Sequence, residues 1–173
     1  MQKRWVVLPP APQEFMAQFP SIPETGASLL YNRGLKTQSA IDKFLSPDYS
    51  RDIHDPFLFK DMQRACERII AAIKQKEKIV VHGDYDADGV TASTILVSCL
   101  NRLGAITDIF LPHREIDGYG LNMDTVRLLA SDGAKLIITC DCGVSNTEEV
   151  ALAQSLGVDV IVTDHHSIPA KLP

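Results

Sequence analysis

Acidic residues and histidines stand directly after three apolar segments of this 173-residue chain. The segments lead into the sequences HGDYDADG at 82–89, CDCG at 140–143 and DHH at 164–166. Each apolar stretch is rich in Val and Ile, which is typical of a buried parallel strand, and the carboxyl ends of such strands form the edge of an α/β sheet where ligands usually bind. Carboxylates crowded at that edge repel one another unless a cation holds them, so the pattern predicts a cation site.

The ligand types in this pattern favour hard divalent cations. Oxygen donors suit magnesium and manganese, and manganese also accepts imidazole, so we expect Mn²⁺ or Mg²⁺ rather than structural zinc. Two ions about 3.5–4 Å apart can activate water and clamp a phosphate for an in-line displacement. A bridging carboxylate would join the two ions. The candidate is Asp141, which lies on a strand of its own; alternatively it only caps the helix after Gly143.

Other familiar binding motifs fail against the first acidic segment. A P-loop needs GxxxxGK[ST] and a dinucleotide fingerprint needs GxGxxG, and residues 82–92 contain neither. Asp84, Asp86 and Asp88 have the spacing of the first ligands of an EF-hand, but Ile95 stands where its final glutamate belongs. The acids therefore suit a site at the edge of a sheet.

Strand-like and helix-like segments alternate along the rest of the chain and would position these residues. Asp61 is expected to cap a first helix, whose apolar residues recur at three- and four-residue spacing. We then expect strands at 79–82, 108–111, 136–140 and 158–163, and helices at 90–103, 123–130 and 147–156. This order indicates βαβ units, and hence an α/β fold in three layers: a parallel sheet flanked by helices.

The first part of the chain has a different pattern. Residues 1–23 contain five prolines, which predicts an irregular arm that lies on the domain or is partly disordered. A short helix is expected at 27–32, and Thr37 is a plausible N-cap for another helix that runs to Leu45. We therefore divide the chain into an arm with short helices at 1–50 and a main domain at 51–173.

Composition bounds the class of protein. With 45% hydrophobic residues, apolar runs too short to cross a bilayer and no secretory signal, we expect a soluble cytoplasmic protein without a membrane partner. Four cysteines show no disulfide framework, so reduced thiols are expected. If the strand continues through Cys140 and Cys142, both thiols face one side and Asp141 the other; packing is the expected role, with thiolate ligation as the alternative.

The net charge of −5 argues against a nucleic-acid substrate, because phosphate binding usually needs an excess of Lys and Arg. Setting aside five clustered acids leaves 17 of the 22, which balances the 17 basic residues. These five are Asp84, Asp86, Asp88, Asp141 and Asp164. Cations bound among them would make the site attractive to phosphate.

The three motifs resemble a known family in both order and spacing. HGDYDADGVTA at 82–92, CDCG at 140–143 and DHH at 164–166 are similar to the first three motifs of the DHH phosphoesterase superfamily. The segments at 29–47, 55–65 and 112–122 resemble its RecJ exonuclease branch. The resemblance implies metal ligation by His82, Asp86, Asp88, Asp141 and His165.

Further roles follow from the same resemblance and from chemistry. Asp84 is placed as a ligand or just behind the ligands, and His166 against the scissile phosphate or leaving group, while Asp164 would orient a neighbouring imidazole. Arg114 could grip a DNA phosphate, or simply pair with Glu115 or Asp117 on an exposed loop.

Tyr119, between two glycines, would stack on a base or pack on the sheet. Each of the site residues has the alternative of being a hydrogen-bonded structural residue.

The resemblance implies a metal-dependent exonuclease that digests single-stranded DNA from the 5′ end in repair and recombination, by a two-metal mechanism. Single-stranded-DNA-binding protein or other repair proteins are the expected protein partners. The alternatives are a phosphodiesterase or pyrophosphatase for small substrates, and a non-catalytic scaffold of a replication or repair assembly. Family members continue into a fourth metal-binding aspartate, a DHHA1-type domain and usually an OB-fold, so we expect this chain to be a fragment that is inactive alone.

Overall fold

The computed structural model describes residues 4–173, and the chain divides into two units, Met1–Leu58 and Phe59–Pro173. The boundary predicted from sequence, between residues 50 and 51, falls inside the short helix α4 (Tyr49–Asp52) of the first unit. Each unit has its own hydrophobic core, so the two are described separately.

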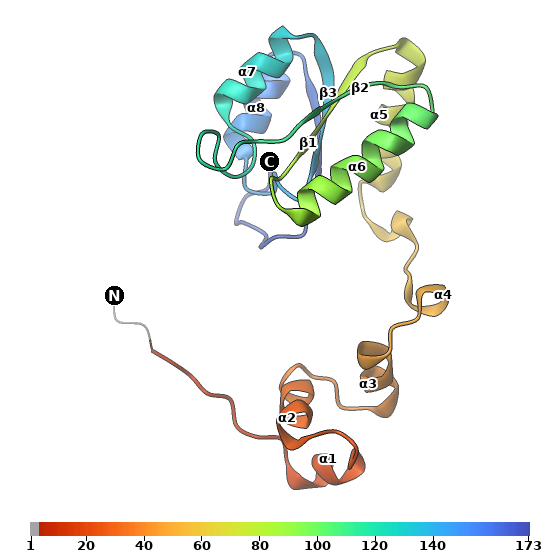
Figure 1. The fold of residues 1–173 in the computed structure, drawn as a ribbon, viewed down its shortest axis with the longest axis vertical. Helices are drawn as coiled ribbons and strands as arrows, with labels where there is room; N and C mark the ends of the chain where they lie inside the picture. Colours follow the sequence, from red (N-terminus) through yellow and green to blue (C-terminus); the bar gives the residue numbers. More distant parts are fainter. Residues whose placement is uncertain (1–3) are drawn as a thin grey trace. The chain divides into compact units, whose positions relative to one another are not determined.

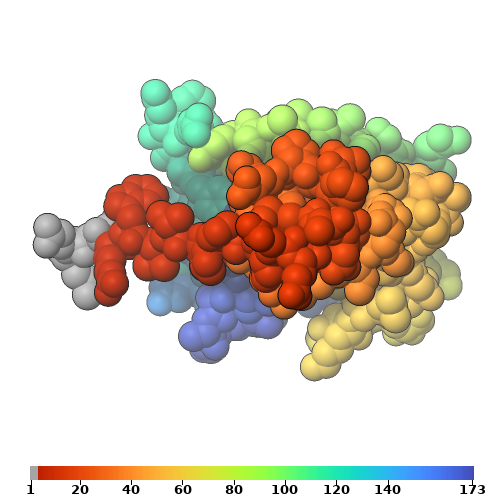
Figure 2. All heavy atoms as spheres, turned by 90° about the horizontal axis from the view of Figure 1, so that it is seen from below, coloured from red at the N-terminus to blue at the C-terminus, as the bar shows by residue number. Residues whose placement is uncertain are grey.

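The first unit is helical. It contains α1 (Gln13–Gln18), α2 (Glu24–Asn32), α3 (Gln38–Leu45), α4 and the 3-10 turn η1 (Pro56–Leu58). The Thr37 hydroxyl accepts a hydrogen bond from the Ala40 amide at 3.3 Å, which confirms the predicted cap of α3. In Figure 2 the atoms of α1 and α2, in red and orange, form one mass from which the preceding residues extend as a narrow arm.

The expectation of an irregular segment over 1–23 is wrong for α1. Pro12 stands at its N-cap, where a missing N–H costs nothing, and Phe15 and Phe19 are both only 6% exposed. Burial of these rings against Tyr31 of α2 stabilises the helix α1, which the proline-rich composition does not predict. Residues 1–3 of the predicted arm lie outside the described residues.

The second unit is an α/β domain (Figure 1). In chain order it contains α5 (Met62–Gln75), β1 (Lys78–Gly83), α6 (Ala87–Arg102), β2 (Ile106–Phe110), α7 (Met123–Ser131), β3 (Ala134–Cys140), α8 (Thr147–Ser155) and β4 (Asp159–Thr163). The strands form one parallel sheet in the order β2-β1-β3-β4. The predicted α/β fold is confirmed, and the predicted strands and helices of the sheet lie within a few residues of those observed.

Helices cover both faces of this sheet (Figure 1). Val80 faces the core formed with α7 and α8, whereas its neighbour Val81 faces the core formed with α5 and α6. Because both faces of a central parallel strand are buried, β1 carries three consecutive apolar residues, Ile79 to Val81, rather than alternating apolar and polar ones. Within residues 4–173, no helix has the length and apolar character needed to cross a membrane.

Two local predictions are corrected by the structure. Asp61 precedes α5, but its side chain makes no capping hydrogen bond. The strand β3 ends at Cys140, and Asp141 turns into the left-handed region with φ of 64°, so the expected alternation through Cys142 is broken. Cys140 packs in the core beneath α5 and α6, while the Cys142 sulfur lies 3.7 Å from His82 Nδ1. Burial raises the pKa of Cys142 to about 12, which favours the packing role of this thiol over thiolate ligation.

Candidate metal centre

The register of the sheet brings three aspartates into one row. Gly83 of β1 pairs with Cys140 of β3, which pairs with Thr163 of β4, and each of these residues is followed by an aspartate. The main chain continues the ladder, since the Asp84 amide donates to Cys140 O at 3.2 Å and the Asp141 amide to Thr163 O at 2.9 Å. Asp84, Asp141 and Asp164 therefore stand side by side at the carboxyl edge of the sheet.

The loop after β1 adds Asp86 to this row. Carboxylate oxygens of Asp84, Asp86 and Asp141 lie within 4.8 Å of one another. Asp86 is fixed as the N-cap of α6, where its Oδ1 accepts hydrogen bonds from the amides of Asp88 and Gly89 at 3.0 and 3.1 Å. The helix approaches so closely that a Cβ on Gly89 would lie 2.4 Å from the Asp84 nitrogen, so only glycine fits there.

Asp84 is the most confined of these acids. It is 3% exposed, and its Oδ1 has no hydrogen-bond partner among the described residues. A buried carboxylate oxygen without a donor is costly unless a cation or proton compensates it. This oxygen is the observation that most directly fits a bound cation.

Asp141 is held in a strained turn. A φ of 64° is unusual for a residue with a Cβ, and the Thr139 hydroxyl supports the turn by donating to Cys142 O at 2.7 Å. Burial raises the pKa of Asp141, and the nearby carboxylate of Asp86 adds to this, while His165 partly offsets it. Because burial and the carboxylate of Asp86 disfavour the ionised form of Asp141, a positive ion nearby would stabilise that form.

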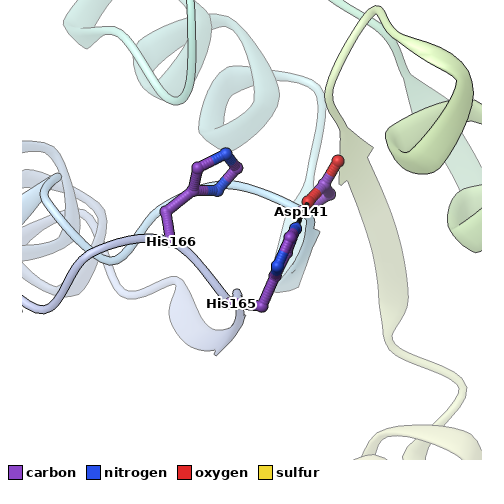
Figure 3. A group of neighbouring side chains, drawn as sticks. All are labelled: Asp141, His165 and His166. Carbon is purple, nitrogen blue, oxygen red and sulfur yellow. Dashed lines mark ion pairs between the residues drawn. The ribbon is translucent and has the colours of Figure 1, made fainter. Parts of the chain in front are cut away.

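A second group forms around the same aspartate (Figure 3). Ligand atoms of Asp141, His165 and His166 lie within 4.8 Å of one another. His165 Nε2 is 2.9 Å from Asp141 Oδ1, although the His165 side chain is 73% exposed. Asp141 is thus shared by the aspartate group and the histidine group, which is the arrangement that a bridging carboxylate requires.

His166 is oriented by two neighbours. Its Nδ1 lies 2.7 Å from Asp164 Oδ1 and 2.9 Å from the Tyr119 hydroxyl, leaving Nε2 free of partners within the described chain. The hydrogen bond to Asp164 raises the pKa of His166. Burial acts to raise the pKa of Asp164, but the amides of Val144 and His166 outweigh it and the pKa lies below its usual range. Asp164 therefore stays ionised and is placed to orient the imidazole.

Two residues expected to be ligands lie outside both groups. His82 is fully buried, stacks on the Phe110 ring with centroids 5.2 Å apart, and has no partner for Nε2 among the described residues. Burial lowers the pKa of His82 to about 4, so its ring is neutral. Asp88 is exposed at the start of α6, where it lines a pocket with Asp141 and His165 but does not join the clustered carboxylates.

The two residues expected to bind substrate reach the same edge. The Arg114 guanidinium lies 5.0 Å from the centroid of the Tyr85 ring, and Tyr85 stands between Asp84 and Asp86 in the sequence. Within the described chain Arg114 forms no ion pair with Glu115 or Asp117. The Tyr119 hydroxyl lies 3.3 Å from the carbonyl oxygen of Asp141 as well as near His166.

Sequence reasoning missed three residues that support these groups. Tyr85 provides the ring under Arg114, Thr139 supports the Asp141 turn, and Asn146 binds the loop that carries Tyr119. Tyr85 and Thr139 lie within or beside motifs, so their position was a signal that could have been used. Asn146 gave a misleading signal, since an asparagine before a helix predicts a cap, whereas its side chain makes none.

The donor set fits divalent cations. It consists of three carboxylates and two imidazoles, and no ion pair recorded within residues 4–173 joins a Lys or Arg to the carboxylates of this set. Oxygen donors with one or two imidazoles are typical of manganese and magnesium sites.

Comparison with known proteins gives the family. The model of the DHH family, N-terminal domain, matches residues 78–173, so the chain belongs to the DHH family. It is similar to the single-stranded-DNA-specific exonuclease RecJ of Bacillus subtilis, with 44% identity over 147 residues that cover 85% of this chain and 19% of the relative. The RecJ of Thermus thermophilus is 41% identical over 177 residues, covering 98% of this chain and 24% of the relative.

Solved structures agree with these relatives. An exonuclease RecJ bound to manganese shares 42% identity with a TM-score of 0.63, over 66% of this chain and 29% of that one. RecJ of Thermus thermophilus in complex with Mg²⁺ shares 30% identity with a TM-score of 0.50, over 94% of this chain and 20% of that one. The chain therefore spans 19% to 29% of the length of these curated and solved relatives.

Proposed function

We propose that this chain forms the metal-binding part of a phosphodiesterase, a RecJ-type exonuclease that digests single-stranded DNA from the 5′ end in repair and recombination. The observation that carries the proposal is the convergence of three aspartates and two histidines at one sheet edge. Similarity to RecJ over 85% and 98% of the chain supports the substrate class. Because the chain covers only 19% and 24% of those relatives, the activity is assigned to the protein that carries it.

We propose Mn²⁺ or Mg²⁺ as the cofactor. The proposed ligand set shares Asp86, Asp141 and His165 with the set that the sequence predicted and differs in its other members. Asp84 and Asp86 would hold one ion, His165 and His166 the other, and Asp141 would bridge the two because it belongs to both groups. When bound, such ions activate water and neutralise charge on a phosphate. The chain itself supplies the fixed carboxylates and the oriented rings.

His82 and Asp88 take other roles in this proposal. The buried, neutral ring of His82 packs beneath the site, and Asp88 faces the open pocket beside Asp141. Arg114, steadied over the Tyr85 ring, would bind a DNA phosphate. Tyr119 would contribute by contacting His166 and the Asp141 carbonyl rather than by stacking on a base.

The test is a nuclease assay with manganese on the protein that carries this chain, using single-stranded DNA of increasing length and a dinucleotide. We expect preference for the longer polymer and complete loss of cleavage in Asp141→Ala, with Asp132→Ala at the opposite end of the sheet as the matched control. Normal cleavage by a folded Asp141→Ala variant would refute the assigned role. Equal cleavage of the dinucleotide would instead favour a phosphodiesterase for small substrates.

We propose that the helical unit is a module separate from the DHH domain. The segment between α4 and α5 contains exposed residues from 53 to 61, which supports an accessible connection. Limited proteolysis should cut first within residues 53–61 and leave the sheet domain intact. Preferred cleavage inside α6 or α8 would contradict this division.

We propose that the protein acts in the cytoplasm on single-stranded DNA, with single-stranded-DNA-binding protein or other repair proteins as candidate protein partners. The DNA-directed relatives and the four free cysteines support this location. Cell fractionation that recovered the protein with membranes would contradict it.

A further inference from the structure

Asn146 stands at the N-cap of α8 but does not cap it. Both ends of its amide are used on another segment instead: Oδ1 accepts from the Leu121 amide at 3.2 Å, and Nδ2 donates to the Leu121 carbonyl at 2.9 Å. A pair of hydrogen bonds to one residue fixes the position and the orientation of that backbone. Asn146 thus joins the turn after the CDCG motif to the loop between β2 and α7.

The loop is shaped to receive this amide. Gly120 is buried with φ of +78°, and a Cβ there would lie 2.6 Å from Asn146 Oδ1. The backbone therefore packs directly on the asparagine, at a conformation that glycine adopts without strain. Leu121 is 2% exposed and joins the core beneath α7 and α8, which anchors the far side of the contact.

The residue before Gly120 reaches the candidate metal centre. The Tyr119 hydroxyl lies 2.9 Å from His166 Nδ1 and 3.3 Å from the Asp141 carbonyl oxygen. The Tyr119 and His166 rings meet edge-on with centroids 5.5 Å apart.

We propose that Asn146 is a positioning residue, which holds Tyr119 against His166 and the Asp141 turn and so fixes the geometry of the metal-binding edge. This inference rests on the proposed function for its consequence, metal affinity, but not for the contact itself. Within the described residues, the Asn146 side chain hydrogen-bonds Leu121 and none of the groups that would bind an ion. Its effect passes through the main chain of Leu121 and Gly120 to the Tyr119 ring.

The first test measures the contact without metal. In the isotope-labelled 173-residue chain, the nuclear Overhauser cross-peak between the Tyr119 and His166 rings should be present in the wild type and lost in Asn146→Ala. The matched control is Asn101→Ala, because the Asn101 side chain bonds Thr107 at the opposite end of the sheet. A cross-peak of wild-type intensity in Asn146→Ala, or its loss in both variants, would overturn the proposal.

A second variant covers the case in which Asn146→Ala does not fold. Asn146→Asp keeps the shape and the acceptor for the Leu121 amide but loses the donor to the Leu121 carbonyl. We expect a weakened cross-peak in this variant, and an unchanged one would overturn the proposal.

The second test measures the consequence by calorimetric titration with manganese. Residues behind the ligands typically contribute 10- to 100-fold to metal affinity, so we expect about tenfold weaker binding in Asn146→Ala and in Tyr119→Phe. The double variant should be no weaker than the worse single variant, because both changes break one chain of contacts. If the losses of manganese affinity in the two single variants added up in the double variant, the proposal that Asn146 acts through Tyr119 would be refuted. A wild-type chain that binds no manganese would contradict the proposed function, while the cross-peak would still decide the role of Asn146.

Discussion

The two ends of the parallel sheet are both rich in acids but differ in what balances them. At the amino end, Lys78 Nζ lies 2.7 Å from Asp108 and 2.5 Å from Asp132, and Arg68 lies 2.7 Å from Glu77 and 2.5 Å from Asp159. At the carboxyl end, the ion-pair partners of the clustered acids within residues 4–173 are both histidines.

The comparison shows that acidic residues serve two purposes in this domain, in ion pairs at the amino end and in a candidate metal site at the carboxyl end. At the amino end each acid pairs with Lys78 or Arg68, so two positive charges offset part of the charge of four acids and stabilise the fold. Acids that crowd without such partners retain a negative field, at a cost in stability that a bound cation removes. Within residues 4–173 no ion pair joins a Lys or Arg to the clustered acids, and this feature, more than the presence of aspartates, marks the carboxyl end as the candidate functional one.

The largest expected effect is on metal binding at the carboxyl end. Asp141→Asn removes the carboxylate shared by both ligand groups, so manganese affinity should fall by more than the range typical of outer residues, about a hundredfold or more. Calorimetric titration of the chain measures this. Asp159→Asn at the amino end is the control and should bind manganese normally. An equal loss in both variants would end the distinction between the two ends.

The next effect is on stability at the amino end. Arg68→Met keeps an apolar stem but loses contacts to Glu77, Asp159 and the Lys135 carbonyl, so the free energy of unfolding should fall by about 1–2 kcal/mol. Urea unfolding in a metal-free buffer gives the value. Manganese affinity should stay unchanged, and a large loss of affinity would show that the two ends are coupled.

A pair of identical substitutions should act with opposite sign. Asp84→Asn removes one of three crowded carboxylates, and we expect the metal-free chain to gain about 1 kcal/mol of stability. Asp132→Asn removes a partner of Lys78 and should lose a smaller amount. Thermal unfolding with a chelator compares them. Destabilisation by both substitutions would contradict the idea that repulsion among the clustered carboxylates lowers the stability of the metal-free chain.

The smallest effect is a pH dependence at the amino end. Hydrogen bonds to Asp108 and then Asp132 raise the pKa of Lys78 above its ordinary value of 10.5. A group whose pKa is raised by folding contributes stability that is fully present below the ordinary value and is lost as pH rises through the folded value. The stability difference between wild type and Lys78→Met should therefore be constant from neutral pH to about pH 9 and shrink above about pH 10.5. A difference that grows with pH would contradict the ion-pair assignment.

Much of the fold follows from local sequence. Val80 and Val81 predict β1 because consecutive β-branched apolar residues suit a strand buried on both faces, and Thr37 predicts the start of α3 because a hydroxyl can cap there. The helix α1 was missed because its stability comes from rings packed on α2, which composition does not reveal.

The candidate site was predictable in its location but only partly in its members. Aspartates after parallel strands had to meet at one edge, but the helix expected from residue 90 begins at Ala87, so Asp88 lies in its first turn while Asp84 continues the strand ladder. Asp141 in a left-handed turn and Asn146 turned away from its helix depend on tertiary contacts. Residues whose role is fixed by distant partners lie beyond what spacing can predict.

The strand order has a consequence for how the domain folds. Because β1 lies between β2 and β3, and β3 between β1 and β4, each pairing must wait for an intervening helix or a longer excursion of the chain. No pairing in this sheet is closed by a tight hairpin, and such long-range contacts slow folding. The edge with the aspartates and histidines needs β1, β3 and β4 together, so it is complete only when all three strands have paired. A metal ion that binds several of these side chains therefore stabilises the assembled sheet.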